Sequence, residues 1–106
     1  MAPRTLLLDL ERGVLTVRLN RPERLNAFSN AMLAELLELL EEVDRNDEIR
    51  VAIFTGEGRA FCAGADLGAG GGTFDRSAVE GALAHRDGGG LAALRLFECR
   101  KPLIAA

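Results

Sequence analysis

Residues 58–67 (Gly-Arg-Ala-Phe-Cys-Ala-Gly-Ala-Asp-Leu) are the part of this chain best suited to chemistry. They follow a short apolar run, 51–54 (Val-Ala-Ile-Phe), which predicts a buried strand. Ala63, Gly64 and Ala65 carry almost no side chain, so a ligand can approach their main-chain N–H groups closely. An uncovered peptide N–H can polarise a carbonyl group or hold an oxyanion. The segment therefore predicts a site that works through its backbone.

The segments before this loop predict a βαβ unit. Residues 5–10 and 14–19 are strand-like runs separated by a short connection that contains glycine, which predicts a hairpin. Leucines recur at helical spacing over about 30–44, after a serine suited to be the N-cap, with glutamates on the other face. The strand 14–19, this helix and a strand over 50–54 predict a parallel pair with a right-handed crossover. The reactive loop then leaves the carboxyl end of a parallel strand, where ligands of open α/β sheets bind.

The second half of the chain predicts a loop, helical segments and one further strand, so the fold class is α/β. Residues 68–73 are rich in glycine and predict a mobile loop. Helical patterns cover about 76–86 and 91–100, and we expect a break at Gly88–Gly90 between them. Each glycine costs roughly 1 kcal/mol relative to alanine inside a helix. A Lys-Pro pair then ends the helix, and 103–106 begins another buried strand.

Composition excludes several functional classes. The 106 residues leave room for one domain at most. The net charge of −3 and the absence of Trp and Tyr argue against nucleic-acid binding. No apolar run approaches the roughly 20 residues of a membrane span, and the N-terminus has no signal-peptide pattern. We therefore expect a cytoplasmic protein without membrane contacts. Two cysteines, Cys62 and Cys99, and one histidine, His85, predict free thiols and no metal site.

Three segments resemble the enoyl-CoA hydratase/isomerase family, also called the crotonase superfamily. They are 19–28 (Leu-Asn-Arg-Pro-Glu-Arg-Leu-Asn-Ala-Phe), 51–67, and 101–106 (Lys-Pro-Leu-Ile-Ala-Ala). Their order, with the leucine- and glutamate-rich helix between the first two, makes the match specific. The resemblance covers essentially all of 1–106 but only the N-terminal portion of the family's single domain. It implies a truncated crotonase-like spiral of ββα turns, and a family assembly of trimers or paired trimers.

The resemblance also implies a reaction. Members of the family act on acyl-CoA thioesters and hold the thioester oxygen with two backbone N–H groups. By resemblance, Ala65 supplies the first of these donors. The peptide N–H after Gly64 would also feel the positive end of a helical turn beginning there. The second donor and the two catalytic glutamates of the hydratases belong to the C-terminal portion. We therefore interpret the glutamates of this chain as solvent-facing residues of a helix: Glu35, Glu38, Glu41 and Glu42.

Residues that bind coenzyme A follow from the same resemblance. Arg24 and the backbone near Ala27 lie in the segment that lines the CoA path, and Arg59 stands where members often place a basic residue near the nucleotide. A guanidinium suits phosphate because its planar fork donates two hydrogen bonds at once. A solvated surface charge is the alternative for each arginine. Backbone groups resembling those of the adenine pocket belong to Ala63, Gly64, Asp66 and Leu67. Coenzyme A would enter as part of the substrate, with no separate cofactor.

Some side chains have simpler interpretations than chemistry. Asp66 fits a capping role after the loop as well as ligand orientation. Cys62 fits a small buried filler better than a nucleophile, because no histidine lies near it in the sequence. Cys99 fits a core thiol at a helix end. His85 fits a position at the surface or at a helix end.

The leading hypothesis is an acyl-CoA enzyme that hydrates a 2,3-unsaturated thioester or shifts its double bond. Residues 1–106 lack one oxyanion donor and both hydratase carboxylates, so we expect the chain alone to be inactive. One alternative is a non-catalytic CoA-binding module or a fragment that completes itself on a partner, which the strand at 103–106 suggests. Another is a different reaction of the superfamily: dehalogenation, thioester hydrolysis or ring-forming condensation.

Overall fold

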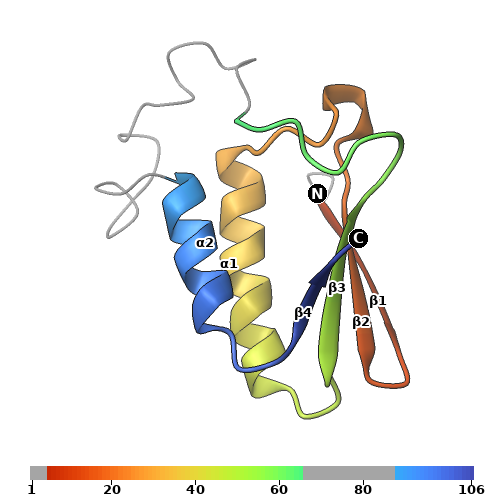
Figure 1. Ribbon diagram of the computed structural model, residues 1–106, viewed down its shortest axis with the longest axis vertical. Coiled ribbons are helices and arrows are strands. Elements are labelled where there is room, and N and C mark those ends of the chain that lie inside the picture. The colour runs from red at the N-terminus through yellow and green to blue at the C-terminus, as the bar shows by residue number, and fades with distance from the viewer. Residues whose placement is uncertain (1–4, 66–87) are drawn as a thin grey trace.

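The computed structural model describes residues 5–65 and 88–106 and has the expected α/β architecture, with two helices on one side of a four-stranded sheet (Figure 1). The strands lie in the order β1-β2-β3-β4. In chain order the elements are β1 (Leu6–Glu11), β2 (Val14–Leu19), the 3₁₀ helix η1 (Pro22–Arg24), α1 (Asn30–Arg45), β3 (Val51–Gly56), α2 (Gly88–Glu98) and β4 (Leu103–Ala105).

The first two strands form the predicted hairpin. They pair antiparallel, from Leu6 opposite Leu19 to Glu11 opposite Val14. Arg12 and Gly13 both have positive φ, at 52° and 83°, which is the backbone that a two-residue turn between twisted strands requires. The Gly13 carbonyl also accepts the Arg50 N–H at 2.8 Å, so the turn is tied to the segment that enters β3.

Helix α1 carries the largest apolar face of the core. The Ser29 hydroxyl accepts the Met32 N–H at 3.2 Å and caps the helix as predicted. The buried residues of the helix recur at three- and four-residue spacing: Met32, Leu33, Leu36, Leu39, Leu40 and Val43. One expectation needs correction. Glu35 does not simply face solvent, because its carboxylate accepts the Thr5 hydroxyl at 2.6 Å and the Thr5 N–H at 3.0 Å. Glu38, Glu41 and Glu42 are exposed as expected.

The crossover through α1 makes β2 and β3 parallel, as the sequence predicts. Their register places Leu19 opposite Gly56, so both strands end at the same edge of the sheet. Strand β4 adds to β3 in the same direction, from Leu103 opposite Ala52 to Ala105 opposite Phe54. The expected further strand is therefore confirmed, and the loops after β2 and β3 leave one edge together.

Gly88–Gly90 were expected to interrupt a helix, but they form the first turn of α2 instead, and a break from the pattern over 76–86 stays a prediction because those residues are not described. The first N–H groups of a helix have no intrahelical acceptor, and glycine therefore costs less helix stability in the first turn than in the helix interior. A Cβ built on Gly88 would lie 3.4 Å from a methyl of Leu33, which places the start of α2 close against α1. The glycine-rich loop 68–73, the helical pattern over 76–86 and His85 fall outside the described residues.

Polar contacts join the C-terminal ends of α1 and α2. The Lys101 ammonium donates to the carbonyls of Ile49 at 2.7 Å and Val43 at 2.8 Å. The Asp44 carboxylate accepts the Arg100 N–H at 2.8 Å and the Arg95 guanidinium at 2.8 Å. These hydrogen bonds lower the pKa of Asp44, with the Arg100 N–H as the largest cause. They join α1 to the segment that leads into β4.

Candidate functional site

Two loops meet at the carboxyl ends of β2 and β3, and they contain every sequence-predicted site residue that the structure describes. Residues 20–28 follow β2 and residues 57–65 follow β3 (Figure 1). A Cβ built on Gly58 would lie 3.1 Å from Cβ of Pro22, so the loops touch near their starts. Gly58 has φ +85°, which a larger residue would adopt only with strain.

A buried asparagine holds these loops together. The Asn26 side chain is completely buried, and its oxygen accepts the Arg21 N–H at 2.7 Å. Its amide nitrogen donates to the carbonyls of Ala60 at 2.8 Å and Glu57 at 3.0 Å. A Cβ built on Gly56 would lie 2.2 Å from the Ala60 oxygen, so only glycine fits where the second loop leaves its strand.

Farther along, the loops pair as a short stretch of parallel strand. The Ala63 N–H donates to the Leu25 carbonyl at 3.0 Å, and the Phe28 N–H donates to the Gly64 carbonyl at 2.7 Å. The second bond belongs to a parallel bridge between Phe28 and Ala65. Gly64 has φ +104°, and a Cβ added to it would meet no atom within 4 Å. Its backbone angle, rather than crowding, therefore favours glycine there.

The bridge decides where the Ala65 N–H points. In a trans peptide, the C=O of one residue and the N–H of the next lie in one plane and point in opposite directions. The Gly64 carbonyl faces the Phe28 N–H, so the Ala65 N–H faces away from the Phe28 segment. Within the described part of the chain, the N–H groups of Gly64 and Ala65 have no hydrogen-bond acceptor, and both residues are exposed.

The arginines lie where a phosphate could reach them. Arg24 ends η1 and Arg59 lies in the loop after β3, and both are exposed. Neither guanidinium has a hydrogen-bond or ion-pair partner among the residues that the structure describes. The two loops thus present two available cations at one edge of the sheet.

Ala27 has less to offer a ligand than the arginines. It is only 8% exposed, and its N–H donates to the Arg24 carbonyl at 3.0 Å. Its carbonyl accepts the Arg21 guanidinium at 2.6 Å, which leaves one lone pair of that oxygen. Asp66 and Leu67 fall outside the described residues. The helical turn expected after Gly64 does not include Ala65, because Ala65 lies in the bridge with Phe28. Any helical turn after Ala65 falls outside the described residues.

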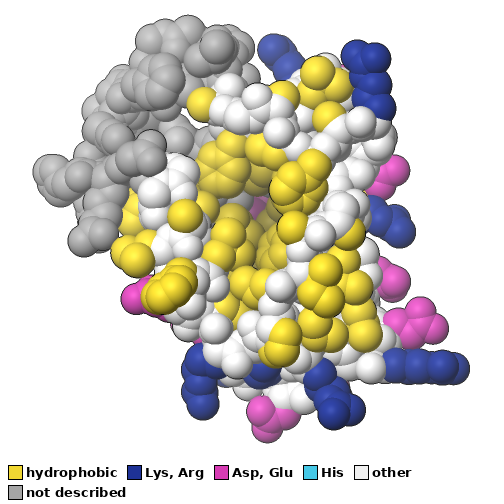
Figure 2. All heavy atoms as spheres, viewed as in Figure 1, with side chains coloured by type: hydrophobic (Ala, Val, Ile, Leu, Met, Phe, Trp, Pro, Cys, Tyr) yellow, Lys and Arg dark blue, Asp and Glu magenta, His cyan; other side chains and the backbone are white. Residues whose placement is uncertain are grey.

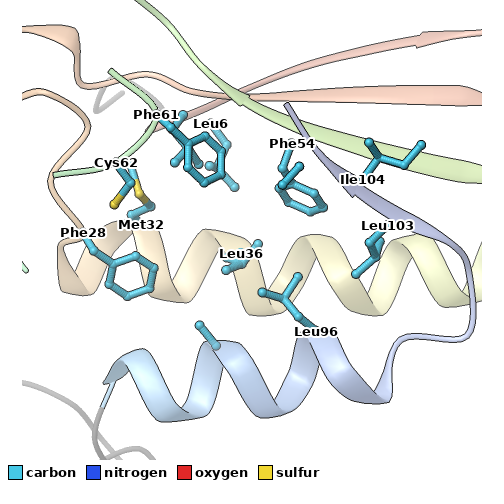
Figure 3. Close-up of a pocket in the computed structure, with 13 residues that line it drawn as sticks. Leu6, Phe28, Met32, Leu36, Phe54, Phe61, Cys62, Leu96, Leu103 and Ile104 are labelled. Carbon is cyan, nitrogen blue, oxygen red and sulfur yellow. The ribbon is translucent and has the colours of Figure 1, made fainter. Parts of the chain in front are cut away.

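An apolar hollow of about 390 Å³ opens between the helices and the sheet, beside the second loop. Figure 2 shows it as a recess surrounded by apolar side chains, and Figure 3 shows Phe28, Phe54 and Phe61 converging on it. It offers hydrocarbon contacts almost exclusively. Its lining consists of Leu6, Leu19, Phe28, Met32, Leu36, Phe54, Phe61, Cys62, Ala92, Leu96, Leu103, Ile104 and Ala105.

The cysteines take no part in a recognisable nucleophilic or metal centre. Cys62 and Cys99 are free thiols of intermediate burial. Cys62 lines the hollow, whereas the Cys99 thiol donates to Asp44 at 3.4 Å. Across 5–65 and 88–106, no three His, Cys, Asp or Glu side chains gather as metal ligands. None of the helices in these ranges is both long and apolar enough to cross a membrane.

Comparison with known proteins identifies the family. The model of the enoyl-CoA hydratase/isomerase family matches residues 9–106. The chain belongs to this family. An enoyl-CoA hydratase of Alternaria alternata is 39% identical over 94 residues, which are 89% of this chain and 30% of that protein. The 1,2-epoxyphenylacetyl-CoA isomerase of Escherichia coli K12 is 55% identical over 62 residues, 58% of this chain and 24% of that protein.

Solved structures of family members share the fold. The enoyl-CoA hydratase/isomerase from Xanthobacter autotrophicus Py2 superposes with a TM-score of 0.78 at 31% identity, over 96% of this chain and 38% of that one. The corresponding enzyme from Mycobacterium paratuberculosis gives 0.77 at 28% identity, over 98% of this chain and 41% of that one. The chain therefore spans roughly a quarter to two fifths of the length of these relatives.

Reasoning from the sequence missed Asn26 and Gly56, the residues that fix how the two family segments meet. The sequence does contain a hint of a buried role for Asn26, because this polar residue stands between the apolar residues Leu25 and Ala27 in a loop. Asparagine also tolerates positive φ, and its φ here is 57°. The acceptors of its amide N–H groups, Glu57 and Ala60, lie more than 30 residues away, and local sequence patterns do not reveal such pairs.

Proposed function

We propose that this chain carries the first oxyanion donor and part of the CoA-binding surface of an acyl-CoA enzyme of the hydratase/isomerase type. The observation that carries the proposal is the orientation of the Ala65 N–H. It points away from the Phe28 segment, lies at the carboxyl end of a parallel strand pair and lacks a described acceptor. A thioester oxygen placed against this N–H would be polarised by a donor that needs no rearrangement.

The chemistry follows from charge. Removing a proton from the α-carbon of a thioester, or adding water to its 2,3 double bond, moves negative charge onto the thioester oxygen. A fixed N–H stabilises that charge more as it grows, so it lowers the barrier more than it tightens ground-state binding. Loss of one such donor typically costs about 10²–10³ in rate. In this proposal the second donor and the acid/base carboxylates come from outside the 106 residues, as the family resemblance implies.

The CoA portion would meet the arginines and the exposed loop. Arg24 and Arg59 supply the cations for its phosphates, because each carries a guanidinium without a described partner. The exposed Gly64 backbone and the Ala63 carbonyl would face the nucleotide or pantetheine, together with Asp66 and Leu67; the Ala63 N–H, expected to be open to a ligand, is instead used by the Leu25 carbonyl. Ala27 would contribute shape more than hydrogen bonds, because its N–H is already engaged.

Hydration and isomerisation both fit a site with this first oxyanion donor, because both develop negative charge on the thioester oxygen. The Alternaria protein is named an enoyl-CoA hydratase and the Escherichia coli protein a 1,2-epoxyphenylacetyl-CoA isomerase. Dehalogenation, thioester hydrolysis and ring-forming condensation use the same polarised thioester in this superfamily. A cytoplasmic location and a trimeric or hexameric assembly stay predictions. One relative, from Arabidopsis thaliana, is named a peroxisomal protein.

Calorimetry and absorbance together test the proposal. The purified chain should bind butyryl-CoA more tightly than free coenzyme A, because only the thioester presents an oxygen to Ala65. The chain alone should not remove the absorbance of a 2-enoyl-CoA. Equal affinity for butyryl-CoA and coenzyme A would reject the oxyanion role. Clear turnover would show that a residue of this chain replaces the expected carboxylates.

A second candidate, a part that completes itself on further polypeptide, is favoured by the apolar hollow. The hollow lies along β4, which pairs with β3 alone among the described strands. Ile104 on that strand is 50% exposed and Phe97 on α2 is 86% exposed. Apolar surface beside a strand edge suits another segment of chain. The occupant that we propose is the remaining polypeptide of a hydratase/isomerase domain, since the solved relatives are more than twice as long as their matched part.

Light scattering and fluorescence test this second candidate. The chain should bind 8-anilinonaphthalene-1-sulfonate, and Ile104→Lys should reduce both that binding and any self-association. Phe97→Lys should reduce the self-association as well. A monomer that binds no dye and is unaffected by either substitution would show that the hollow needs no partner.

A further inference from the structure

Asn26 is the polar residue that the described structure buries completely, and all of its hydrogen-bonding groups point at main chain. Its oxygen accepts the Arg21 N–H in its own loop at 2.7 Å. Its amide nitrogen donates to Ala60 at 2.8 Å and to Glu57 at 3.0 Å in the other loop. One side chain therefore spans the two segments that carry the family resemblance.

The surroundings leave this side chain no alternative position. Both N–H donors of the amide are used, and a buried donor without a partner is costly. A Cβ built on Gly56 would lie 2.8 Å from the amide nitrogen, which shows how tightly that strand end packs on it. The backbone of Asn26 adopts φ 57°, an angle that asparagine tolerates better than most residues.

Asn26 stands between the two main-chain contacts that orient the proposed oxyanion donor. The carbonyl of the preceding residue, Leu25, accepts the Ala63 N–H, and two residues later the Phe28 N–H donates to Gly64. The second contact sets the direction of the Ala65 N–H, because the Gly64 carbonyl and the Ala65 N–H belong to one peptide plane. The first contact holds Ala63, the residue before Gly64, against the same segment. Moving the Leu25–Phe28 segment would turn that plane.

We infer that Asn26 is a positioning residue: its side chain locks the Arg21–Phe28 loop onto the Glu57–Ala65 loop and so aims the Ala65 N–H. This inference rests on the proposed function, in which that N–H polarises a thioester. Asn26 touches no substrate in this account and acts only through the backbone that it holds. A residue that merely stabilised the fold would affect the whole chain, whereas a positioning residue affects the loop pair.

Hydrogen exchange of single amides, followed by NMR on the 106-residue chain, tests the lock without any ligand. Asn26→Asp keeps the size and the acceptor but removes both donated hydrogen bonds, and Asn26→Gly removes the side chain without straining φ. In both variants the amides of Ala63 and Phe28 should exchange about tenfold faster or more, the effect expected from a lost hydrogen bond. The amide of Leu40 in α1 should keep its wild-type rate.

Asn46 supplies the matched control. Its side chain also makes two hydrogen bonds, to Glu42 at 3.1 Å and from the Glu48 N–H at 2.9 Å, but it lies at the opposite end of α1. Asn46→Asp and Asn46→Gly should leave the amides of Ala63 and Phe28 unchanged. Unchanged exchange in both Asn26 variants would overturn the inference. Equal acceleration of the Leu40 amide would also overturn it, because it indicates general destabilisation.

The infrared carbonyl stretch of butyryl-CoA, labelled with ¹³C at the thioester carbonyl, adds the functional readout. Binding to the wild-type chain should shift this stretch to lower frequency. Asn26→Asp should lose most of that shift while the dissociation constant rises by no more than about threefold, since CoA contacts outside the carbonyl remain. A full shift in Asn26→Asp would overturn the inference. If the wild-type chain binds no butyryl-CoA, the proposed function fails, and the exchange rates alone decide whether Asn26 holds the loop.

Discussion

The Phe28 N–H donates to the Gly64 carbonyl at 2.7 Å, and this single bond turns the next peptide N–H, that of Ala65, away from the protein segment beside it. The relationship joins two family segments that lie 36 residues apart in the chain. Under the proposed function, this bond is what lets a loop of alanine and glycine polarise a thioester. The side chains leave the space open, and the pairing sets the direction of the donor.

Gly64→Ala should disturb this direction without a steric clash. The position has φ +104° but nothing within 4 Å of an added Cβ. An alanine there is strained by about 1–3 kcal/mol or turns the peptide. We expect a loss of unfolding free energy in that range and a loss of preference for butyryl-CoA over coenzyme A. Urea unfolding and calorimetry measure the two effects. An unchanged preference for butyryl-CoA over coenzyme A would show that the Gly64 backbone does not contribute to thioester binding.

Gly56→Ala should be more damaging, for a different reason. An added Cβ would lie 2.2 Å from the Ala60 oxygen and 2.7 Å from the Phe61 oxygen, so the backbone of the second loop must move. Overpacking against rigid atoms typically costs about 1–3 kcal/mol and sometimes more. The free energy of unfolding should therefore fall further than for Gly64→Ala. The reverse order in urea titrations would contradict the described contact between Gly56 and the 60–61 backbone.

Arg24→Gln and Arg59→Gln should each weaken binding of coenzyme A. A hydrogen bond to a charged group is worth about 1.5–3 kcal/mol, so a loss of roughly 10- to 150-fold in affinity is expected if each guanidinium meets a phosphate. The dependence of affinity on salt should weaken as well. Arg45→Gln is the control, since Arg45 is exposed but pairs with Glu42 at the far end of α1. Equal losses in all three variants would point to general electrostatics.

The Asp44 carboxylate should make stability depend on acid. Its pKa is lowered by the Arg100 N–H and by Arg95, so the native state favours the charged form. This stabilisation is fully present above the unfolded pKa of about 3.9 and is lost as the pH falls through the lower native pKa. The difference in unfolding free energy between wild type and Asp44→Asn should be largest near pH 7 and shrink below about pH 4. A difference that stays constant from pH 7 to pH 3 would show that the charge of Asp44 is not involved.

The sequence predicts the fold well where local patterns determine structure. The leucine spacing of α1, its Ser29 cap and the parallel strands on either side of it all follow from local spacing or chain order. The glycines expected to interrupt a helix lie instead in the first turn of α2, where the cost of glycine in a helix interior does not apply. The start of this helix also packs close to Leu33, a contact that no local pattern reveals.

The candidate site is predictable in composition but not in how it is assembled. The small residues 63–65 indicate a backbone site from the sequence alone. The direction of the Ala65 N–H follows from the bond between Phe28 and Gly64, and we infer that the bond between Asn26 and Ala60 supports it; both pairs lie more than 30 residues apart. Glu35 shows the same limit, because Thr5 binds it from 30 residues away.

The most direct test observes the Ala65 amide itself. Proton NMR of the ¹⁵N-labelled chain would follow this amide during titration with butyryl-CoA and, separately, with free coenzyme A. A new hydrogen bond to the thioester oxygen should move the Ala65 proton downfield with butyryl-CoA and leave it nearly unmoved with coenzyme A. An Ala65 proton that responds identically to both ligands, or to neither, would contradict the assignment of this amide as the oxyanion donor.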